Sequence, residues 1–204
     1  MSWLRRLGRA PPPEPEEEEG GPRPVERAAP GISALFEGVR ADRSHTVLDF
    51  GPASEGSLEL YSRYAQRIRF ADLLTAPPGG SSWTEALDAV PRYPGHPYDL
   101  VLAWNLLDRM APEQRPAVVE RLADLTGPGA RLYMVMDSSG GATTQPLRFT
   151  LQGTRRVSQE PAGPPHPAWR RPLPAEVERL VAPFRVVQAY VLRLGMREYV
   201  AVKG

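Results

Sequence analysis

Two acidic residues follow short apolar runs, in positions where nucleotide-binding sheets place their ligand contacts. Asp49 lies near the end of residues 45–50 (HTVLDF), and Gly51-Pro52 breaks the chain directly afterwards. Asp72 stands 21 residues after Gly51. A glycine lets the backbone turn sharply and lets a ligand approach closely. An acid about 20 residues further on can accept hydrogen bonds from both hydroxyls of a ribose, so the pattern indicates a nucleotide-type site.

Helical and strand patterns alternate along most of the chain. Apolar spacing predicts helices over about 31–40, 56–67, 82–90, 112–125 and 174–182. Apolar or β-rich runs predict strands over 45–50, 68–73, 98–104, 131–136, 184–194 and 197–202. Residues 138–172 are expected to be irregular, with a hairpin around Gly153. The alternation predicts an α/β fold: a doubly wound, mostly parallel sheet with helices on both faces.

The end of the chain departs from that alternation. Only a short turn at Gly195 separates the last two predicted strands, which is too short for a crossover helix. The two strands must therefore pair antiparallel. An antiparallel C-terminal hairpin distinguishes this sheet from that of ordinary dinucleotide-binding dehydrogenases.

Together these features resemble the class I S-adenosylmethionine-dependent methyltransferases, with a Rossmann-like domain expected over residues 31–204. The resemblance implies S-adenosyl-L-methionine as cofactor and an unidentified methyl acceptor. It implies that Asp49 holds the cofactor's ammonium group, directly or through water, and that Asp72 holds the ribose. The same comparison assigns cofactor contacts to the residues of the loop after the first strand and of the end of the 98–104 strand, namely Gly51, Pro52, Ala53, Ala103, Trp104 and Asn105.

The glycine-rich loop of the family is altered in this sequence. Its second glycine is Ala53, its third is Glu55, and Gly56 is displaced by one residue. The usual third strand is also not evident between 74 and 97. A Cβ at position 53 and a carboxylate at position 55 both crowd the place where the cofactor's carboxylate would lie.

Each proposed site residue also has a purely structural interpretation. Asp49 and Asp72 are both able to cap turns through backbone N–H groups. Trp104 suits the core or the wall of a crevice as well as a ligand contact, and Asn105 suits a turn at a strand end. The sequence leaves these alternatives open.

Three hypotheses for function follow. The first is methyl transfer from S-adenosylmethionine to a small molecule or protein side chain. This reaction depends mainly on positioning two reactants, so it needs no signature base in the sequence. The second is a non-catalytic relative that acts as a regulatory or partner-binding module. The third, a nicotinamide-dependent oxidoreductase, is disfavoured by the C-terminal hairpin and the glycine spacing.

Composition excludes several other classes. The 25 basic and 24 acidic residues nearly cancel, which argues against a nucleic-acid partner. Cysteine is absent, and His45, His96 and His166 show no metal-ligand spacing, so no metal site is expected. Lys203 is the single lysine, which leaves no lysine for a phosphate-binding loop or a Schiff base.

One segment is rich in arginine. Between 138 and 173 five arginines face the single acid Glu160, namely Arg148, Arg155, Arg156, Arg170 and Arg171. Such a segment could attract an anionic substrate. A general preference for arginine throughout the chain explains it equally well.

Residues 1–30 differ from the rest. They contain a proline cluster at 11–13 and the acidic run Glu16–Glu19, and such composition cannot bury enough apolar surface to order itself. We expect a disordered tail that is a candidate arm for partner contact. No run of about 18 apolar residues occurs, so no transmembrane segment is expected, and the cytoplasm is the predicted location.

Overall fold

A six-stranded sheet forms the centre of the computed structural model, which describes residues 24–74, 82–93, 95–138 and 141–204. The strand order is β10-β11-β5-β4-β2-β3. The strands are β2 (His45–Asp49), β3 (Ala65–Phe70), β4 (Tyr98–Trp104), β5 (Thr126–Asp137), β10 (Phe184–Val191) and β11 (Met196–Lys203). β2 to β5 are mutually parallel, and β11 runs antiparallel to both β5 and β10. The mostly parallel sheet and its antiparallel C-terminal hairpin are confirmed.

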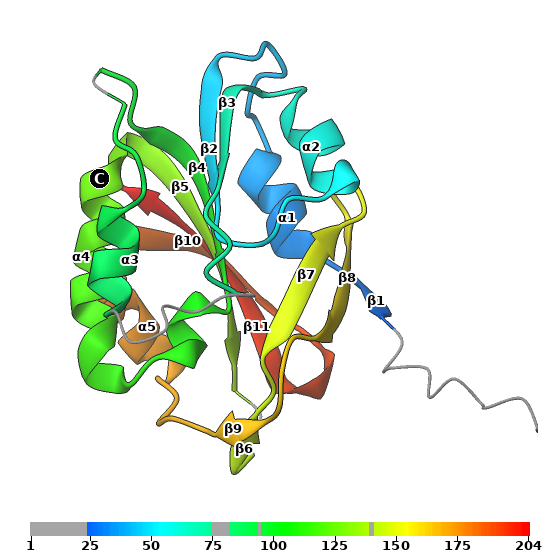
Figure 1. The fold of residues 1–204 in the computed structure, drawn as a ribbon, viewed down its shortest axis with the longest axis vertical. Coiled ribbons are helices and arrows are strands. Elements are labelled where there is room, and N and C mark those ends of the chain that lie inside the picture. Colours follow the sequence, from blue (N-terminus) through cyan, green and yellow to red (C-terminus); the bar gives the residue numbers. More distant parts are fainter. Residues whose placement is uncertain (1–23, 75–81, 94, 139–140) are drawn as a thin grey trace, which may run out of the picture.

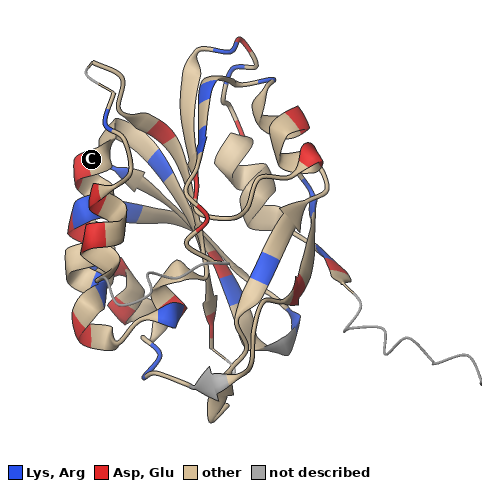
Figure 2. Ribbon diagram, viewed as in Figure 1, with Lys and Arg blue, Asp and Glu red and all other residues tan. Residues whose placement is uncertain are grey.

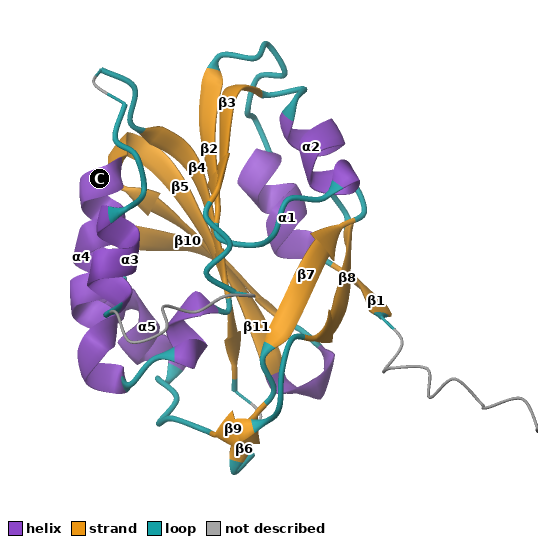
Figure 3. Ribbon diagram, in the orientation of Figure 1, coloured by secondary structure: helices purple, strands orange, loops and turns teal. Residues whose placement is uncertain are grey.

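Helices cover both faces of this sheet (Figures 1 and 3). α1 (Pro30–Phe36) and α2 (Glu55–Tyr61) lie on one face; α3 (Trp83–Asp88), α4 (Arg115–Leu125) and α5 (Pro174–Leu180) lie on the other. Acidic and basic residues are interspersed over α3 and α4 (Figure 2). Within the described ranges, no helix combines the length and apolar character needed to cross a membrane. α3 begins with a capping box, in which Ser82 and Glu85 exchange side-chain and backbone hydrogen bonds.

A second, three-stranded sheet lies on the α1 and α2 side, in the order β1-β8-β7. It consists of β1 (Val25–Ala28), β7 (Leu147–Leu151) and β8 (Arg156–Pro161). The predicted hairpin around Gly153 is confirmed, because β7 and β8 pair antiparallel on either side of it. The prediction that 138–172 is irregular is wrong in extent, since β7, β8 and the short pair β6 (Thr143–Thr144) and β9 (His166–Pro167) fall within it.

The predicted tail boundary at residue 30 is also wrong. Residues 25–28 form β1, which pairs antiparallel with β8, and Ala29 is fully buried. The composition of residues 1–30 as a whole concealed this, because the backbone of a short strand can pair without an apolar run. Residues 1–23, which carry the proline and glutamate clusters, lie outside the described residues.

Several element limits differ from those predicted. α2 ends at Tyr61 instead of about 67, and β3 starts at Ala65 instead of 68. The register of β3 against β2, with Ala65 opposite His45, extends the strand into Gln66 and Arg67, two exposed polar residues that an apolar run does not reveal. Asp72 consequently lies two residues beyond the end of β3, in a turn.

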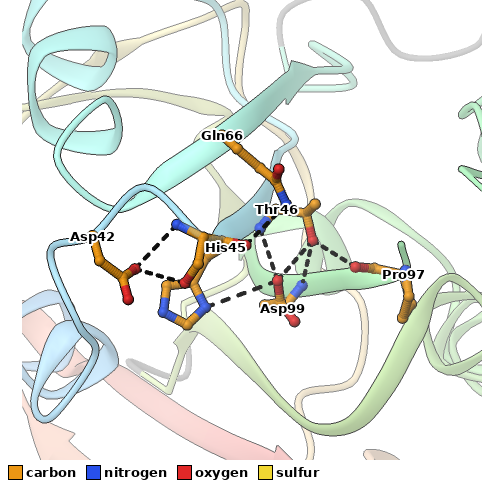
Figure 4. A network of polar contacts seen from close by, with 7 residues as sticks. Asp42, His45, Thr46, Gln66, Pro97 and Asp99 are labelled. Atoms are coloured by element: carbon orange, nitrogen blue, oxygen red, sulfur yellow. Dashed lines mark hydrogen bonds and ion pairs between the residues drawn. The ribbon is translucent and has the colours of Figure 1, made fainter. Parts of the chain in front are cut away.

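A polar network fixes the start of β2 against that of β4, at the opposite edge from the predicted site (Figure 4). The Asp99 carboxylate accepts hydrogen bonds from the backbone N–H and the hydroxyl of Thr46, at 2.8 and 2.9 Å. The Thr46 hydroxyl also lies 2.5 Å from the carbonyl of Pro97. Asp99 therefore has a structural role at the amino edge of the sheet.

A buried charge pair joins β1 to the central sheet. Glu198 of β11 is fully buried and accepts hydrogen bonds from the Arg27 guanidinium (2.6 Å), the Tyr133 hydroxyl (2.8 Å) and the Gly31 N–H (2.6 Å). A Cβ at Gly31 would lie 2.9 Å from atoms of both Glu198 and Tyr133. The glycine is thus what allows the start of α1 to approach the carboxylate.

We predict that Arg27→Ala lowers the free energy of unfolding by about 3 kcal/mol, because it leaves the Glu198 carboxylate buried without a counter-charge. Arg156→Ala is the matched control, since Arg156 of β8 forms an exposed ion pair with Glu26, the residue before Arg27 in β1. That loss should stay within about 1 kcal/mol. Urea unfolding measures both, and equal losses would contradict the role given to Glu198.

Candidate functional site

The candidate site lies where β2 and β4, adjacent parallel strands, end side by side. The chain leaves β2 for β3 on one side of the sheet and later enters β4 on the other, so the strand order reverses between β2 and β4. Ligands of open α/β sheets bind at such a reversal, outside the carboxyl ends of the strands. Asp49 ends β2 and Trp104 ends β4, as the sequence predicted.

Asp49 is held by three donors from the protein itself. One carboxylate oxygen, Oδ1, accepts the Gly51 N–H (2.7 Å) and the Trp104 indole N–H (2.6 Å). The other, Oδ2, accepts the Tyr61 hydroxyl (2.6 Å). Asp49 is 1% exposed. We call Asp49, Gly51, Tyr61 and Trp104 the Asp49 cluster.

Burial raises the pKa of Asp49 to about 6, although the hydrogen bonds from Tyr61, Trp104 and Gly51 favour the charged form. The pKa of Tyr61 is raised well above 10, first by burial and then by the negative charge of Asp49. Tyr61 therefore remains a donor across the whole working pH range. Because the folded pKa of Asp49 lies above its ordinary value, ionisation of Asp49 destabilises the fold as the pH rises through about 6.

Trp104 closes the crevice over Asp49. Its indole ring stacks on Phe149 of β7 at a centroid distance of 5.0 Å and an angle of 6°, and it meets Tyr133 edge-on at 5.4 Å. The side chain is 1% exposed, and its backbone has φ of 50°. A left-handed conformation is unfavourable for a bulky residue, so the surrounding packing must hold it there.

The loop after β2 is packed against the same cluster at its start and open further on. A Cβ at Gly51 would lie 3.1 Å from Asp49 Oδ1 and 3.2 Å from Trp104 Nε1, so a larger residue there would press on the cluster. Pro52 is half-buried and Ala53 is exposed. Ala53 lines a shallow hollow beside α2 together with Leu58 and Ile68. Gly51 therefore belongs to the closed cluster, whereas Ala53 lies on the surface.

Asp72 lies near a half-buried arginine that the sequence analysis missed, Arg109. Burial lowers the pKa of Arg109 to about 10, and the negative charges of Asp72 and Asp108 oppose that shift. The Arg109 guanidinium donates to the carbonyls of Leu74 and Leu147. The sequence signal that could have revealed Arg109 is its place as a basic residue in the turn after the buried strand β4.

The two remaining predicted contacts are also buried. Ala103 is 1% exposed and Asn105 is 4% exposed. The Asn105 side-chain oxygen lies 3.4 Å from Arg109 Nε. The strand end thus brings all the predicted β4 residues to the crevice, but under cover of the protein's own side chains.

Most arginines of the 138–173 segment are paired with acids. Arg148 pairs with Glu160 and Arg156 with Glu26; Arg170 and Arg171 pair with Glu176 and Asp137. These ion pairs neutralise much of the positive charge that the segment carries in sequence. They weaken the idea that it attracts an anionic substrate.

The residue types at this edge suit an S-adenosyl cofactor, but their arrangement leaves it no contact with Asp49. The Asp49 carboxylate accepts hydrogen bonds from Gly51, Tyr61 and Trp104 and is almost fully buried. An ammonium group would reach it only after one of the side chains that cover it moves. Sequence reasoning missed Tyr61 as a partner of Asp49, since a tyrosine in the apolar pattern of a helix gives no sign of its hydrogen-bond partner.

We predict that Tyr61→Phe lowers the free energy of unfolding by about 1–3 kcal/mol, because it leaves a buried carboxylate oxygen without a donor. The loss should be larger at pH 8 than at pH 5, since only ionised Asp49 depends fully on that donor. Urea unfolding at the two pH values measures it. Tyr64→Phe is the control, because the Tyr64 hydroxyl makes no hydrogen bond within the described structure; a pH-independent loss in Tyr61→Phe would argue against the cluster.

Comparisons with known proteins place the fold. No protein-family model and no curated protein matches the chain. Among solved structures, a putative S-adenosylmethionine-dependent methyltransferase from Listeria monocytogenes aligns with 86% of this chain and 99% of its own, at 13% identity and a TM-score of 0.50.

Two other structures align less closely. The 1,6-didemethyltoxoflavin-N1-methyltransferase of Burkholderia thailandensis is 17% identical, with a TM-score of 0.45, over 85% of this chain and 76% of its own. The pyocyanin biosynthetic protein PhzM is 13% identical, with a TM-score of 0.45, and the 85% of this chain that aligns spans 54% of its length. Taken with the strand order and the reversed last strand, the Listeria likeness identifies the architecture: this chain has the fold of the class I S-adenosylmethionine-dependent methyltransferases.

Proposed function

We propose that the protein binds S-adenosylmethionine at the carboxyl edge of β2, β3 and β4 and transfers its methyl group to an acceptor. The observation that carries the proposal is the gathering of Asp49, Gly51, Asp72 and Asn105 at the point where the strand order reverses. A fold alone does not imply a function. The argument therefore depends on these residue types at this edge.

Each residue has a task in that proposal. Asp72, in the turn after β3, would accept hydrogen bonds from the ribose hydroxyls. Gly51 would let the backbone approach the ligand, and Ala103 and Asn105 would border the reacting end. The bound cofactor would supply an electrophilic methyl group, and the protein would position the acceptor in line with it and exclude water.

The proposal requires Trp104 to move. In this proposal the cofactor ammonium takes the place of the indole N–H, which gives up its 2.6 Å hydrogen bond to Asp49, and the ring then also leaves its stack on Phe149. Binding must offset the loss of both interactions. Cofactor affinity is therefore expected to be modest.

A second candidate function is favoured by the closed arrangement around Asp49. The Asp49 cluster is complete without a ligand, which is what a non-catalytic protein of this fold would show. Such a protein would serve as a regulatory or partner-binding module. The N-terminal tail as an interaction arm, a cytoplasmic location and the lack of a nucleic-acid partner all stay predictions.

Calorimetric titration with S-adenosylhomocysteine tests the binding proposal. We expect wild type to bind with a Kd in the micromolar range or weaker, about 8 kcal/mol or less. Asp72→Asn should lose about 1–3 kcal/mol, because a ribose hydroxyl loses a charged acceptor. Asp42→Asn, at an exposed acid on the opposite edge, should bind as wild type does. Equal binding by wild type and Asp72→Asn would exclude Asp72 as the ribose contact.

Trp104→Ala separates the two candidate functions. If Trp104 occupies cofactor space, its removal should tighten S-adenosylhomocysteine binding by about tenfold, or about 1.4 kcal/mol. Near-ultraviolet circular dichroism would check that the variant folds. Absence of binding in both wild type and Trp104→Ala would reject the methyltransferase proposal in favour of the non-catalytic one.

A further inference from the structure

A small cavity of about 190 Å³ lies beside the crevice, at the carboxyl ends of β4 and β5. It is smaller than the roughly 300–1,000 Å³ of pockets for drug-sized ligands. Its polar lining includes Asn105, Asp108, Asp137, Thr144 and Gln145. The apolar remainder is formed by Val135, Leu147 and Met196. The cavity thus combines acceptor groups with an apolar wall.

Asp108, in the 3-10 turn η1 (Leu106–Arg109), is one of the residues that line this cavity. The residue is 5% exposed. Its Oδ2 accepts the Asp137 N–H at 2.7 Å, while its buried Oδ1 has no hydrogen-bond partner in the described structure. A buried acceptor without a donor is costly, and a structure that keeps one calls for an explanation.

The neighbouring cations are already committed elsewhere. Arg115 donates to the carbonyls of Leu107 (2.9 Å) and Arg170 (3.0 Å). Arg171 binds the Asp137 carboxylate at 2.7 Å. Neither forms an ion pair with Asp108 among the pairs of the described residues. Neither Arg115 nor Arg171 therefore supplies the donor that Asp108 Oδ1 lacks.

The charges around Asp108 are consistent with a cationic ligand that donates a hydrogen bond to its carboxylate. Burial raises the pKa of Asp108 to about 7, and the negative charge of Asp137 adds to the rise; the Asp137 N–H and the charges of Arg115 and Arg171 oppose it. A ligand cation would stabilise the ionised form, and charge-assisted hydrogen bonds are the stronger kind. The apolar wall suits a short hydrocarbon stem.

We propose that this cavity binds a small primary alkylamine in its ammonium form, with an N–H group donating to Asp108 Oδ1 and the alkyl stem against Val135, Leu147 and Met196. The site goes beyond the methyl-transfer proposal, because none of these contacts involves a cofactor. Asn105 lies on the border between the cavity and the crevice, so a bound amine would sit next to the Asp49 cluster.

The Asp137 amide provides a direct reporter, since it donates to the other oxygen of Asp108. In ¹H–¹⁵N spectra of the full chain at pH 8, propylammonium chloride should shift the Asp137 amide signal saturably. Tetramethylammonium chloride, which has the same charge but no N–H, and sodium chloride should not, at matched ionic strength. No saturable shift, or an equal response to tetramethylammonium, would overturn the proposal.

Two further measurements locate the contact. Asp108→Asn should weaken propylammonium binding at least about tenfold, whereas Asp124→Asn, at an exposed acid of α4, should leave it unchanged; equal binding by the two variants contradicts the proposal. If Asp108→Asn does not fold, the wild-type protein still decides. Its affinity should fall on the order of tenfold from pH 8 to pH 6, because a proton then competes for Asp108. A pH-independent affinity rejects the assignment, and neither result depends on S-adenosylmethionine binding.

Discussion

The carboxylate of Asp49 is buried at the end of β2, and its need for hydrogen-bond donors shapes what surrounds it. A buried carboxylate without partners is strongly unfavourable, so its donors must be brought to it by separate elements. Gly51 comes from the loop after β2, Tyr61 from the end of α2 and Trp104 from the end of β4. Through the stack of Trp104 on Phe149, the second sheet is joined to the same point. One charge thus links four parts of the chain.

A comparable arrangement joins β11 to its neighbours. Glu198 of β11 is buried and takes donors from β1, α1 and β5. β11 could not lie between β5 and β10 with a carboxylate facing inwards unless Arg27 and Tyr133 were there to meet it. The N-terminal strand is therefore part of the folded domain. A buried charge of this kind is worth little in net stability, but its loss of a partner is costly, which makes it a strong constraint on packing.

The functional consequence is a competition at the crevice. If the cofactor binds as proposed, its ammonium group and the Trp104 indole N–H would compete for the Asp49 carboxylate. A ligand can shift such an equilibrium only by as much as it prefers the open arrangement. Asp108, a few residues beyond Trp104, differs in this respect, because one of its oxygens lacks a donor within the described structure. Asn105 follows Trp104 of the closed Asp49 cluster in the sequence, and it lines the same cavity as Asp108.

The sequence alone determined the class of fold. The alternation of helical and strand periodicity and the short turn near Gly195 are both local signals. It also placed Asp49 and Trp104 at the ends of their strands, since the buried runs 45–50 and 98–104 are continuous. It could not determine that Tyr61 and Trp104 would both turn towards Asp49, because a tyrosine or tryptophan in an apolar pattern gives no sign of its hydrogen-bond partner. The sequence likewise does not show that residues 25–28 form a strand, since the partner strand that orders them lies more than a hundred residues away. Side-chain direction and long-range pairing are properties of the packed structure, and here they decide whether the crevice is open or closed.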